Sequence, residues 1–348
     1  MKITSIIKED VENIIKDNNL LDLADSTFFI TGATGLIGGY FLYTVYLLNK
    51  LYNKNHKIIL LVRNKDKLPK EIQEDKTIKF LIQDVTEEIK IDEKIDYVIH
   101  TAGPASPKVM KVDPLGVNLA NTLGTINTLK LAKESNSKGY LFISSREIYG
   151  EAASDQKFFY EEGPYGKLDH LIVRNSYSES KKNAENLLAC YQYQYDLNVK
   201  AVRLAHTYGP GINIHDGRVQ SDFLLNYMNN EDIVMNSTGE ARRTYTYIGD
   251  AINAMFKVLL LAPKEELIYN VSDPENEISI KELAELIASF SDKIKVVQKV
   301  QETKNASYAP FSLGILSNEK IKGLGYKGRY DLKDGFARTI KHLEEETC

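Results

Sequence analysis

The chain has 348 residues, of which 43% are apolar and 26% charged, and its formal net charge is −4 at neutral pH. This composition is typical of a globular protein with a sizeable core, and the slight acidity argues against a nucleic-acid-binding protein, which would carry a basic face. Because the only cysteines are Cys190 and Cys348, we expect neither a disulfide framework nor a metal site.

The first segment with a clear periodicity is residues 5–17, where isoleucine and valine recur on one face of a predicted amphipathic helix. The N-terminus carries charges throughout and lacks the apolar centre of a signal peptide, so we expect a cytoplasmic protein. No charged residue lies between Asp25 and Lys50, which is about the length of a membrane span. Glycines interrupt this stretch, and a buried strand followed by a buried helix is the better interpretation.

Residues 28–39, FFITGATGLIGG, combine a short apolar run with Gly32, Gly35 and Gly38, and a long apolar segment follows. A strand, a glycine turn and a helix in this order form the phosphate-binding start of a dinucleotide fold. The turn lets backbone N–H groups approach a pyrophosphate, and the helix N-terminus presents its positive end to it. The spacing G-x-x-G-x-x-G matches the general fingerprint only loosely, so a tight turn without a ligand remains the alternative.

Further buried strands are predicted at 57–62, 78–82, 97–100, 140–143 and 199–204, with helices at 114–135 and about 177–196. Strands without clear alternation, separated by helices, indicate a parallel sheet covered on both faces. We therefore predict an α/β fold, a Rossmann-type doubly wound parallel sheet with a smaller, interleaved C-terminal substrate domain. The expected boundaries are an extension at 1–25, the dinucleotide-binding domain at 26–205, and a mainly substrate-binding part at 206–348. About 244–272 is expected to return to the first domain.

Tyr177 and Lys181 lie four residues apart at the start of a predicted helix, and Ser145 ends a predicted strand. A lysine ammonium near a phenol stabilises the phenolate and lowers its pKa from about 10. The three side chains could exchange a proton with a substrate alcohol while a nicotinamide accepts or returns hydride. Such a pair alone is common on helix surfaces, and it gains weight here from the glycine turn that precedes it.

Several short blocks extend this pattern along the chain: TGATGLIGG at 31–39, HTAGPASP at 100–107, NTLGT at 121–125, SSREIYG at 144–150, YSESKKNAE at 177–185, HTYGPG at 206–211, DGRVQSDF at 216–223 and RTYTYIGD at 243–250. In these blocks the chain resembles the extended short-chain dehydrogenase/reductases of the NAD-dependent epimerase/dehydratase family. The resemblance runs from Thr27 to about Thr339. The PASP, DGRV-x-S-x-F and R-x-x-x-Y-x-x-D blocks are most similar to those of UDP-glucuronate decarboxylases.

The resemblance implies a catalytic set of Ser145, Glu147, Tyr177 and Lys181, in which Tyr177 is the acid/base and Lys181 also binds the cofactor ribose. The cofactor residues that it implies are Gly32, Thr34, Gly35, Leu36, Ile37, Gly38, Arg63, Asp84, Val85, Ala102 and Gly103, together with Tyr177 and Lys181. The substrate residues that it implies are Ser106, Arg146, Arg174, His206, Arg218 and Arg243, and Asn121 is expected to be structural. A homodimer through a four-helix contact that includes the Tyr177 helix is also implied; Ala184, Leu187 and Leu188 suit either that contact or the core.

Some positions depart from the family pattern and leave the exact sugar open. Arg146 stands where 4,6-dehydratases of the dTDP-glucose type carry an aspartic acid, and an arginine does not donate that proton at neutral pH. It could instead hold a sugar C6 carboxylate, or turn outward into solvent. Met110 replaces a tyrosine of the decarboxylases, and His206 and Gly211 replace an asparagine and an arginine.

The end of the second predicted strand also departs from the pattern. NAD-specific proteins place an acidic residue there for the ribose hydroxyls, whereas this chain has Arg63, followed by Asn64 and Lys65. A cation there suits a 2′-phosphate, which favours NADP, but an arginine can equally stack on the adenine of NAD. The cofactor is therefore expected to be NAD or NADP.

The function that we expect is modification of a nucleotide sugar through transient oxidation at C4, with no nucleic-acid or membrane partner. Decarboxylation of a UDP-uronate is the first choice, followed by 4-epimerisation and then 4,6-dehydration. A non-catalytic nucleotide-binding protein on the same fold, and a reductase that consumes free NADPH, are the alternatives.

Overall fold

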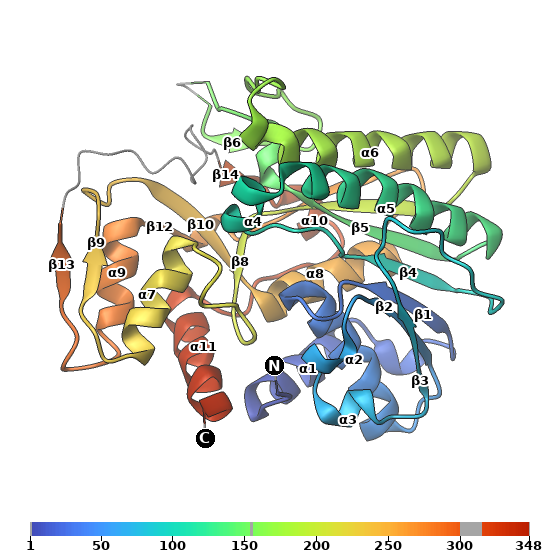
Figure 1. The fold of residues 1–348 in the computed structure, drawn as a ribbon, viewed down its shortest axis with the longest axis horizontal. Coiled ribbons are helices and arrows are strands. Elements are labelled where there is room, and N and C mark those ends of the chain that lie inside the picture. Colours follow the sequence, from blue (N-terminus) through green and yellow to red (C-terminus); the bar gives the residue numbers. More distant parts are fainter. Residues whose placement is uncertain (1, 154–155, 300–314, 348) are drawn as a thin grey trace.

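The computed structural model describes residues 2–153, 156–299 and 315–347. At its centre lies a seven-stranded sheet whose strands run parallel in the order β11-β7-β5-β4-β1-β2-β3 (Figure 1). The strands are β1 (Thr27–Thr31), β2 (Lys57–Val62), β3 (Ile78–Ile82), β4 (Tyr97–His100), β5 (Gly139–Ser145), β7 (Val199–Leu204) and β11 (Ile268–Val271). The strand order reverses between β1 and β4, which is where ligands bind in open α/β sheets.

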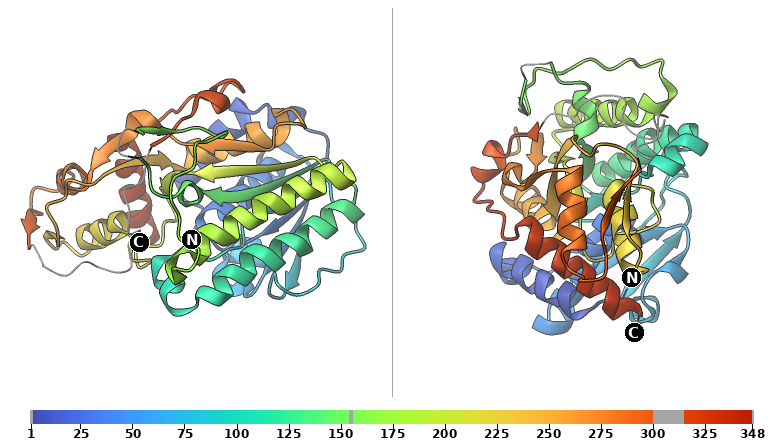
Figure 2. Two further views of the ribbon diagram at one scale, coloured as in Figure 1. Left: turned by 90° about the horizontal axis from the view of Figure 1, so that it is seen from above. Right: turned by 90° about the vertical axis from the view of Figure 1, so that its left-hand side faces the viewer.

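Helices cover both faces of this sheet (Figures 1 and 2). One layer holds α5 (Pro114–Glu134) and α6 (Ser176–Tyr195), and the other holds α1 (Ser5–Asp17), α2 (Leu36–Tyr52) and α8 (Ile248–Leu261). Phe28 and Ile30 pack into the core on the α2 side, while Phe29 between them packs into the core on the α5 side. Because both faces are buried, the strands read as continuous apolar runs, and the predicted doubly wound fold is confirmed.

Ala184 and Leu188 belong to the core beneath α6 and are fully buried, with Leu187 packed partly against it. The sequence left open whether these residues form a subunit contact or the core. Ala184 and Leu188 belong to the core. Their burial against the sheet leaves no surface for a subunit contact.

The smaller lobe is built mainly after residue 205. It contains a three-stranded sheet of β8 (His206–Tyr208), β10 (Arg242–Tyr247) and β12 (Glu277–Ser279), a pair of β9 (Ile233–Met235) and β13 (Val296–Gln298), and the helices α7 (Val219–Met228), α9 (Ile280–Ala288) and α11 (Leu332–Thr347). Shorter elements are α3 (Lys70–Gln73), α4 (Pro107–Val112), α10 (Glu319–Lys322), β6 (Phe158–Phe159) and β14 (Ile315–Leu316). The chain returns to the main sheet through α8 and β11. Ser279 is the N-cap of α9 and forms a reciprocal capping box with Glu282.

The predicted N-terminal helix is present as α1 and is an integral part of the core. Its apolar face carries a buried carboxylate, Asp10, which accepts hydrogen bonds from the hydroxyls of Tyr40 (2.9 Å) and Tyr247 (2.8 Å). Arg338 of α11 pairs with the other carboxylate oxygen at 2.6 Å. Burial raises the pKa of Asp10, and Arg338 opposes this rise. The network therefore joins α1 to α2, β10 and α11.

Among the described residues, no helix has both the length and the apolar character that a bilayer crossing requires. The uncharged stretch between Asp25 and Lys50 consists of β1, the glycine turn and most of α2, as the sequence indicated.

Candidate active site

The residues predicted to bind the cofactor lie at one edge of the sheet, because they follow the carboxyl ends of neighbouring parallel strands. The glycine turn, with Thr34, follows β1 and leads into Leu36 and Ile37 at the start of α2. Arg63 follows β2, Asp84 and Val85 follow β3, and Ala102 and Gly103 follow β4. The structure therefore brings these positions together, and their contact with a cofactor stays a prediction.

The three glycines of the turn differ in what surrounds them. Gly32 has φ +70°, and a Cβ there would lie 2.6 Å from Thr101 Oγ1. A Cβ on Gly38 would collide with the carbonyl oxygen of Gly32. Gly35 is the exposed N-cap of α2, and a Cβ there would meet nothing closer than that carbonyl oxygen at 3.4 Å. Packing thus requires glycine at positions 32 and 38. The open space around Gly35 lies at the N-terminus of α2, where a pyrophosphate could bind.

The predicted catalytic side chains converge where α6 packs on β5. Ser145 is the last residue of β5, and its hydroxyl is hydrogen-bonded to the phenol of Tyr177. Lys181 lies one turn further along α6, with its Nζ 5.8 Å from the centre of the Tyr177 ring. This Nζ donates to the carbonyl oxygen of Ile143 at 2.7 Å. All three side chains are buried, so the structure joins them into one constellation.

Burial dominates the acid–base properties of this constellation. It raises the pKa of Tyr177 to about 12, and the carboxylate of Glu147 raises it further, while the hydrogen bond from Ser145 lowers it. The same burial lowers the pKa of Lys181 to about 7, and Glu185 opposes that change. The sequence-based prediction that Lys181 brings the phenol below its ordinary pKa is therefore wrong for the protein alone. Desolvation of the phenolate is the largest cause of the raised pKa of Tyr177, and the same burial disfavours the charge of Lys181.

Glu147 is held by an arginine from the segment before α6. Arg174 donates from its two terminal nitrogens to the two carboxylate oxygens at 3.0 and 3.1 Å, and the Ser178 hydroxyl donates to one of them at 3.3 Å. The sequence assigned Arg174 to the substrate, whereas in the structure both terminal nitrogens contact Glu147.

Three of the predicted substrate residues, Arg146, His206 and Arg243, influence one another electrostatically. Arg146 is only 4% exposed, which excludes the outward-turned alternative, and burial together with the nearby Arg243 lowers its pKa to about 9. His206 lies on β8, opposite Tyr245 of β10, and burial followed by the fields of Arg146 and Arg243 holds its pKa well below the ordinary range. A neutral histidine in the field of these guanidinium groups leaves the region positively charged, which suits an anionic group.

Two other predicted substrate residues connect the lobes. The guanidinium of Arg218 pairs with Asp216 at 2.5 Å and donates to the carbonyl oxygen of Ala105 at 2.7 Å. The Ser106 hydroxyl donates to the carbonyl oxygen of Asp216 at 3.0 Å. Met110, which replaces a tyrosine of the decarboxylases, is buried in an apolar cluster with Tyr177.

Arg63 lies in the open at the end of β2. Its side chain is 77% exposed and is 3.9 Å from the carboxylate of Asp84, which is itself partly exposed. The guanidinium can therefore reorient toward a ligand at low cost, because a solvent-exposed ion pair contributes little.

Sequence reasoning missed a buried network behind the catalytic residues. Glu185 accepts from the Ser144 hydroxyl at 2.5 Å and from Arg203 at 3.0 and 2.7 Å. Arg203 also donates to the hydroxyl of Tyr149 at 2.8 Å. The position of Glu185, one helical turn after Lys181, is the only signal in the sequence that could have found it.

A family model for the NAD dependent epimerase/dehydratase family matches residues 28–272, which include the glycine turn and the whole catalytic constellation. The chain belongs to this family. The match covers well over half of the chain and ends just after β11, the last strand of the main sheet.

The chain is also similar to individual proteins of this family. It is 28% identical to UDP-glucuronic acid decarboxylase 6 of Arabidopsis thaliana, over 90% of this chain and 89% of that protein. It is 26% identical to UDP-glucuronic acid decarboxylase 1 of Xenopus tropicalis, over 91% of this chain and 72% of that protein.

Solved structures share the fold at lower identity. A UDP-glucose 4-epimerase of Thermotoga maritima with UDP-glucose superimposes with a TM-score of 0.75 at 19% identity, over 92% of this chain and 100% of that one. A dTDP-glucose 4,6-dehydratase of Bacillus anthracis in complex with NAD gives 0.71 at 20% identity, over 92% of this chain and 97% of that one. At such identities the likeness establishes the fold.

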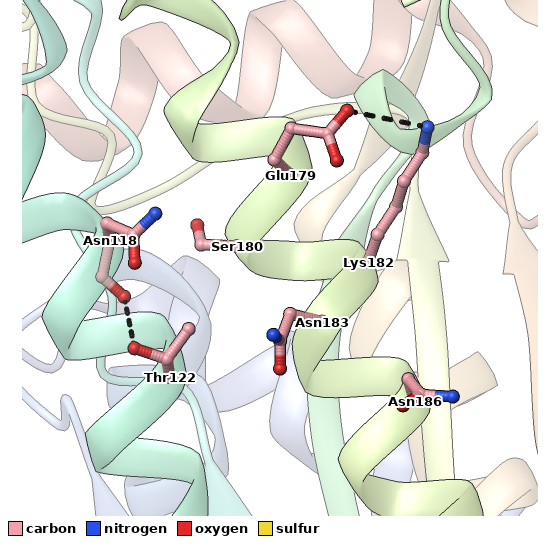
Figure 3. A pocket seen from close by; sticks show the side chains of 7 residues that line it. All are labelled: Asn118, Thr122, Glu179, Ser180, Lys182, Asn183 and Asn186. Carbon is pink, nitrogen blue, oxygen red and sulfur yellow. Dashed lines mark hydrogen bonds and ion pairs between the residues drawn. The ribbon is translucent and has the colours of Figure 1, made fainter. Parts of the chain in front are cut away.

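A groove of about 420 Å³ lies between α5 and α6 (Figure 3). Its lining is polar and consists of Asn118, Thr122, Glu179, Ser180, Lys182, Asn183 and Asn186. Ser145, Tyr177 and Lys181 do not line it, so this groove is separate from the candidate active site.

The contrast between Gly35 and Gly38 gives a test of the cofactor site. We expect Gly38→Ala to lower the free energy of unfolding by about 1–3 kcal/mol, because the added methyl collides with the backbone. Gly35→Ala should cost less than about 1 kcal/mol in stability but weaken dinucleotide binding at least about tenfold, because the methyl fills the open space. Chemical denaturation and isothermal titration calorimetry measure the two effects. Undiminished dinucleotide binding by Gly35→Ala would contradict this assignment.

Proposed function

We propose that this protein modifies a nucleotide sugar by transient oxidation of its C4 hydroxyl, and that its substrate is a UDP-uronate that loses its C6 carboxyl group as CO2. The observation that carries the proposal is the buried Ser145–Tyr177–Lys181 constellation with Glu147 beside it. Binding alone has no need of such an arrangement, which argues against a non-catalytic nucleotide-binding protein.

The proposed reaction uses these residues as follows. A bound nicotinamide supplies a reversible acceptor for the C4 hydride. The Tyr177 phenolate takes the proton of the sugar O4 hydroxyl, which Ser145 orients by a hydrogen bond. The resulting C4 ketone lets the C5–C6 bond break, because its electrons move into an enolate across C5, C4 and O4. C5 would take its proton from water, and as the hydride returned from the nicotinamide to C4, Tyr177 would return its proton to O4.

The positive charge around Arg146 and Arg243 supports a substrate with a carboxylate at C6, in addition to the diphosphate. The named relatives, which are UDP-glucuronic acid decarboxylases, support the same choice. A 4-epimerase is the second candidate, because it needs the same C4 oxidation. A 4,6-dehydratase is third, because Arg146 keeps its proton at neutral pH.

The substrate proposal has a direct test. We expect the purified protein to convert a UDP-uronate in a panel of UDP-, GDP-, CDP- and dTDP-sugars followed by NMR. Tyr177→Phe should lower turnover by about 10²–10⁴-fold, since it removes the acid/base, while dinucleotide binding is retained. A wild-type protein that leaves every sugar unchanged would refute the enzyme. Turnover that survives Tyr177→Phe would refute the role of this residue.

For the cofactor, the exposed Arg63 favours NADP over NAD, because a guanidinium binds a 2′-phosphate in place of the ribose hydroxyls. Both dinucleotides would serve a reaction in which the hydride is returned in each turnover.

We expect mass spectrometry of the denatured protein to find bound NADP, which would also argue against a reductase that depends on free NADPH. Arg63→Ala should weaken binding of NADPH by about tenfold or more while leaving NADH binding nearly unchanged, because a charge-assisted hydrogen bond contributes about 1.5–3 kcal/mol. Lys70→Ala, which removes an exposed cation on α3, is the matched control. If the denatured protein released NAD and no NADP, the cofactor would be NAD and the proposal of NADP would be wrong.

We also propose a homodimer through the outer face of α5. Leu115, Leu119 and Leu123 follow one another at intervals of four residues on this helix and are 67%, 37% and 41% exposed. An apolar stripe of this kind favours burial against another helix.

Light scattering should give twice the chain mass for the wild type and the chain mass for the double variant Leu115→Glu, Leu119→Glu. The control is Leu261→Glu, because Leu261 is 57% exposed on α8, in the opposite helix layer. A monomeric wild type would contradict the dimer.

A further inference from the structure

We propose that Arg174 is a positioning residue, which holds Glu147 in one orientation and offsets its charge beside Tyr177. The inference concerns the catalytic constellation and therefore rests on the proposed function. It gives Arg174 a role different from the substrate contact that the sequence indicated.

The ion pair joins the two segments that carry the catalytic hydroxyls. Glu147 lies in a 3₁₀ turn two residues after Ser145, and Arg174 lies in a 3₁₀ turn three residues before Tyr177. The side chains of Arg174 and Glu147 are 15% and 18% exposed, so solvent screens the pair only weakly. The neighbouring Asn175 fixes the second turn by donating to the carbonyl oxygen of Asp169 at 2.8 Å.

The bidentate geometry determines what Glu147 can do. Its two carboxylate oxygens accept two guanidinium N–H groups and one hydroxyl, which together fix the orientation of the carboxylate. Glu147 is therefore held as a hydrogen-bond acceptor in one orientation. A lysine could replace the charge of Arg174 but not its two parallel hydrogen bonds.

The pair also acts on Tyr177. The phenol is approached by Glu147 after β5, by Arg174 before α6, by Lys181 on α6 and by Arg218 at the start of α7, while α4 and α5 contribute apolar side chains. Glu147 raises the pKa of the phenol because two neighbouring anions repel, and Arg174 and Arg218 lower it. Without Arg174, the carboxylate would face the phenol uncompensated.

The test is the pH dependence of kcat/KM for the wild type, Arg174→Gln, Glu147→Gln and the double variant. Removing Arg174 raises the pKa of Tyr177, so the rising limb should move up by about one pH unit, a tenfold loss on the limb. Glu147→Gln should move the limb down. The double variant should return it close to the wild-type position, because the two charges act on the same group.

Two further variants separate this role from others. Arg174→Lys should restore the position of the limb but not the full rate, because the charge remains and the fork is lost. Lys182→Gln is the control, since Lys182 lies on the same helix and pairs with Glu179 at 3.8 Å outside the active site. A uniform loss of kcat/KM with an unmoved limb in Arg174→Gln would overturn the proposal.

A readout without turnover keeps the inference distinct from the proposed reaction. The ring carbon that bears the Tyr177 hydroxyl, labelled with ¹³C and assigned by comparison with Tyr177→Phe, titrates with the phenol in NMR. Its midpoint should rise in Arg174→Gln and fall in Glu147→Gln, whether or not any sugar is converted. Unchanged midpoints would overturn the positioning role, whereas shifted midpoints without sugar conversion would refute the reaction alone.

Discussion

The hydrogen bond from the ammonium group of Lys181 to the carbonyl oxygen of Ile143 holds the candidate active site together. It fixes α6 against β5 at the point where that strand ends in Ser145, and so it sets the position of Tyr177 relative to Ser145. The Glu185–Arg203 pair reinforces the same junction one turn further along α6. Lys181, Glu185 and Arg203 are buried, so moving any one of these side chains would leave a buried polar group without its hydrogen-bond partner.

Burial of this junction has an electrostatic consequence. It raises the pKa of Tyr177 and lowers that of Lys181, so the protein alone does not favour the ionised pair that proton transfer requires. The surrounding charges therefore decide the working range. Arg174 offsets Glu147, and Arg146 and Arg243 place positive charge near His206, which would suit the anionic sugar that we propose as the substrate.

The smaller lobe and the N-terminal helix are tied to this centre by polar contacts across the chain. Arg218 donates to the carbonyl oxygen of Ala105, so the lobe that begins after residue 205 contacts the loop that follows β4. On the other side of the sheet, Asp10 joins α1 to Tyr40, Tyr247 and Arg338. Arg338 also pairs with Glu9 at 3.0 Å, whereas Asp10 has Arg338 as its ion-pair partner, so removing Arg338 would leave a buried carboxylate without a counter-charge.

The local sequence pattern was enough to predict the fold. Strands buried on both faces appear as continuous apolar runs, and the glycine turn follows the first of these runs. The same pattern also put Ser145, Tyr177 and Lys181 in one site, through strand ends and a helical spacing of four. The ion pairs and pKa shifts that depend on residues far apart in the sequence were decided only by the tertiary structure. Arg174 pairs with Glu147 across 27 positions and Arg146 turns inward beside Arg243, and desolvation reversed the expected pKa of Tyr177. Burial and long-range charge depend on the packed structure, and no local spacing records them.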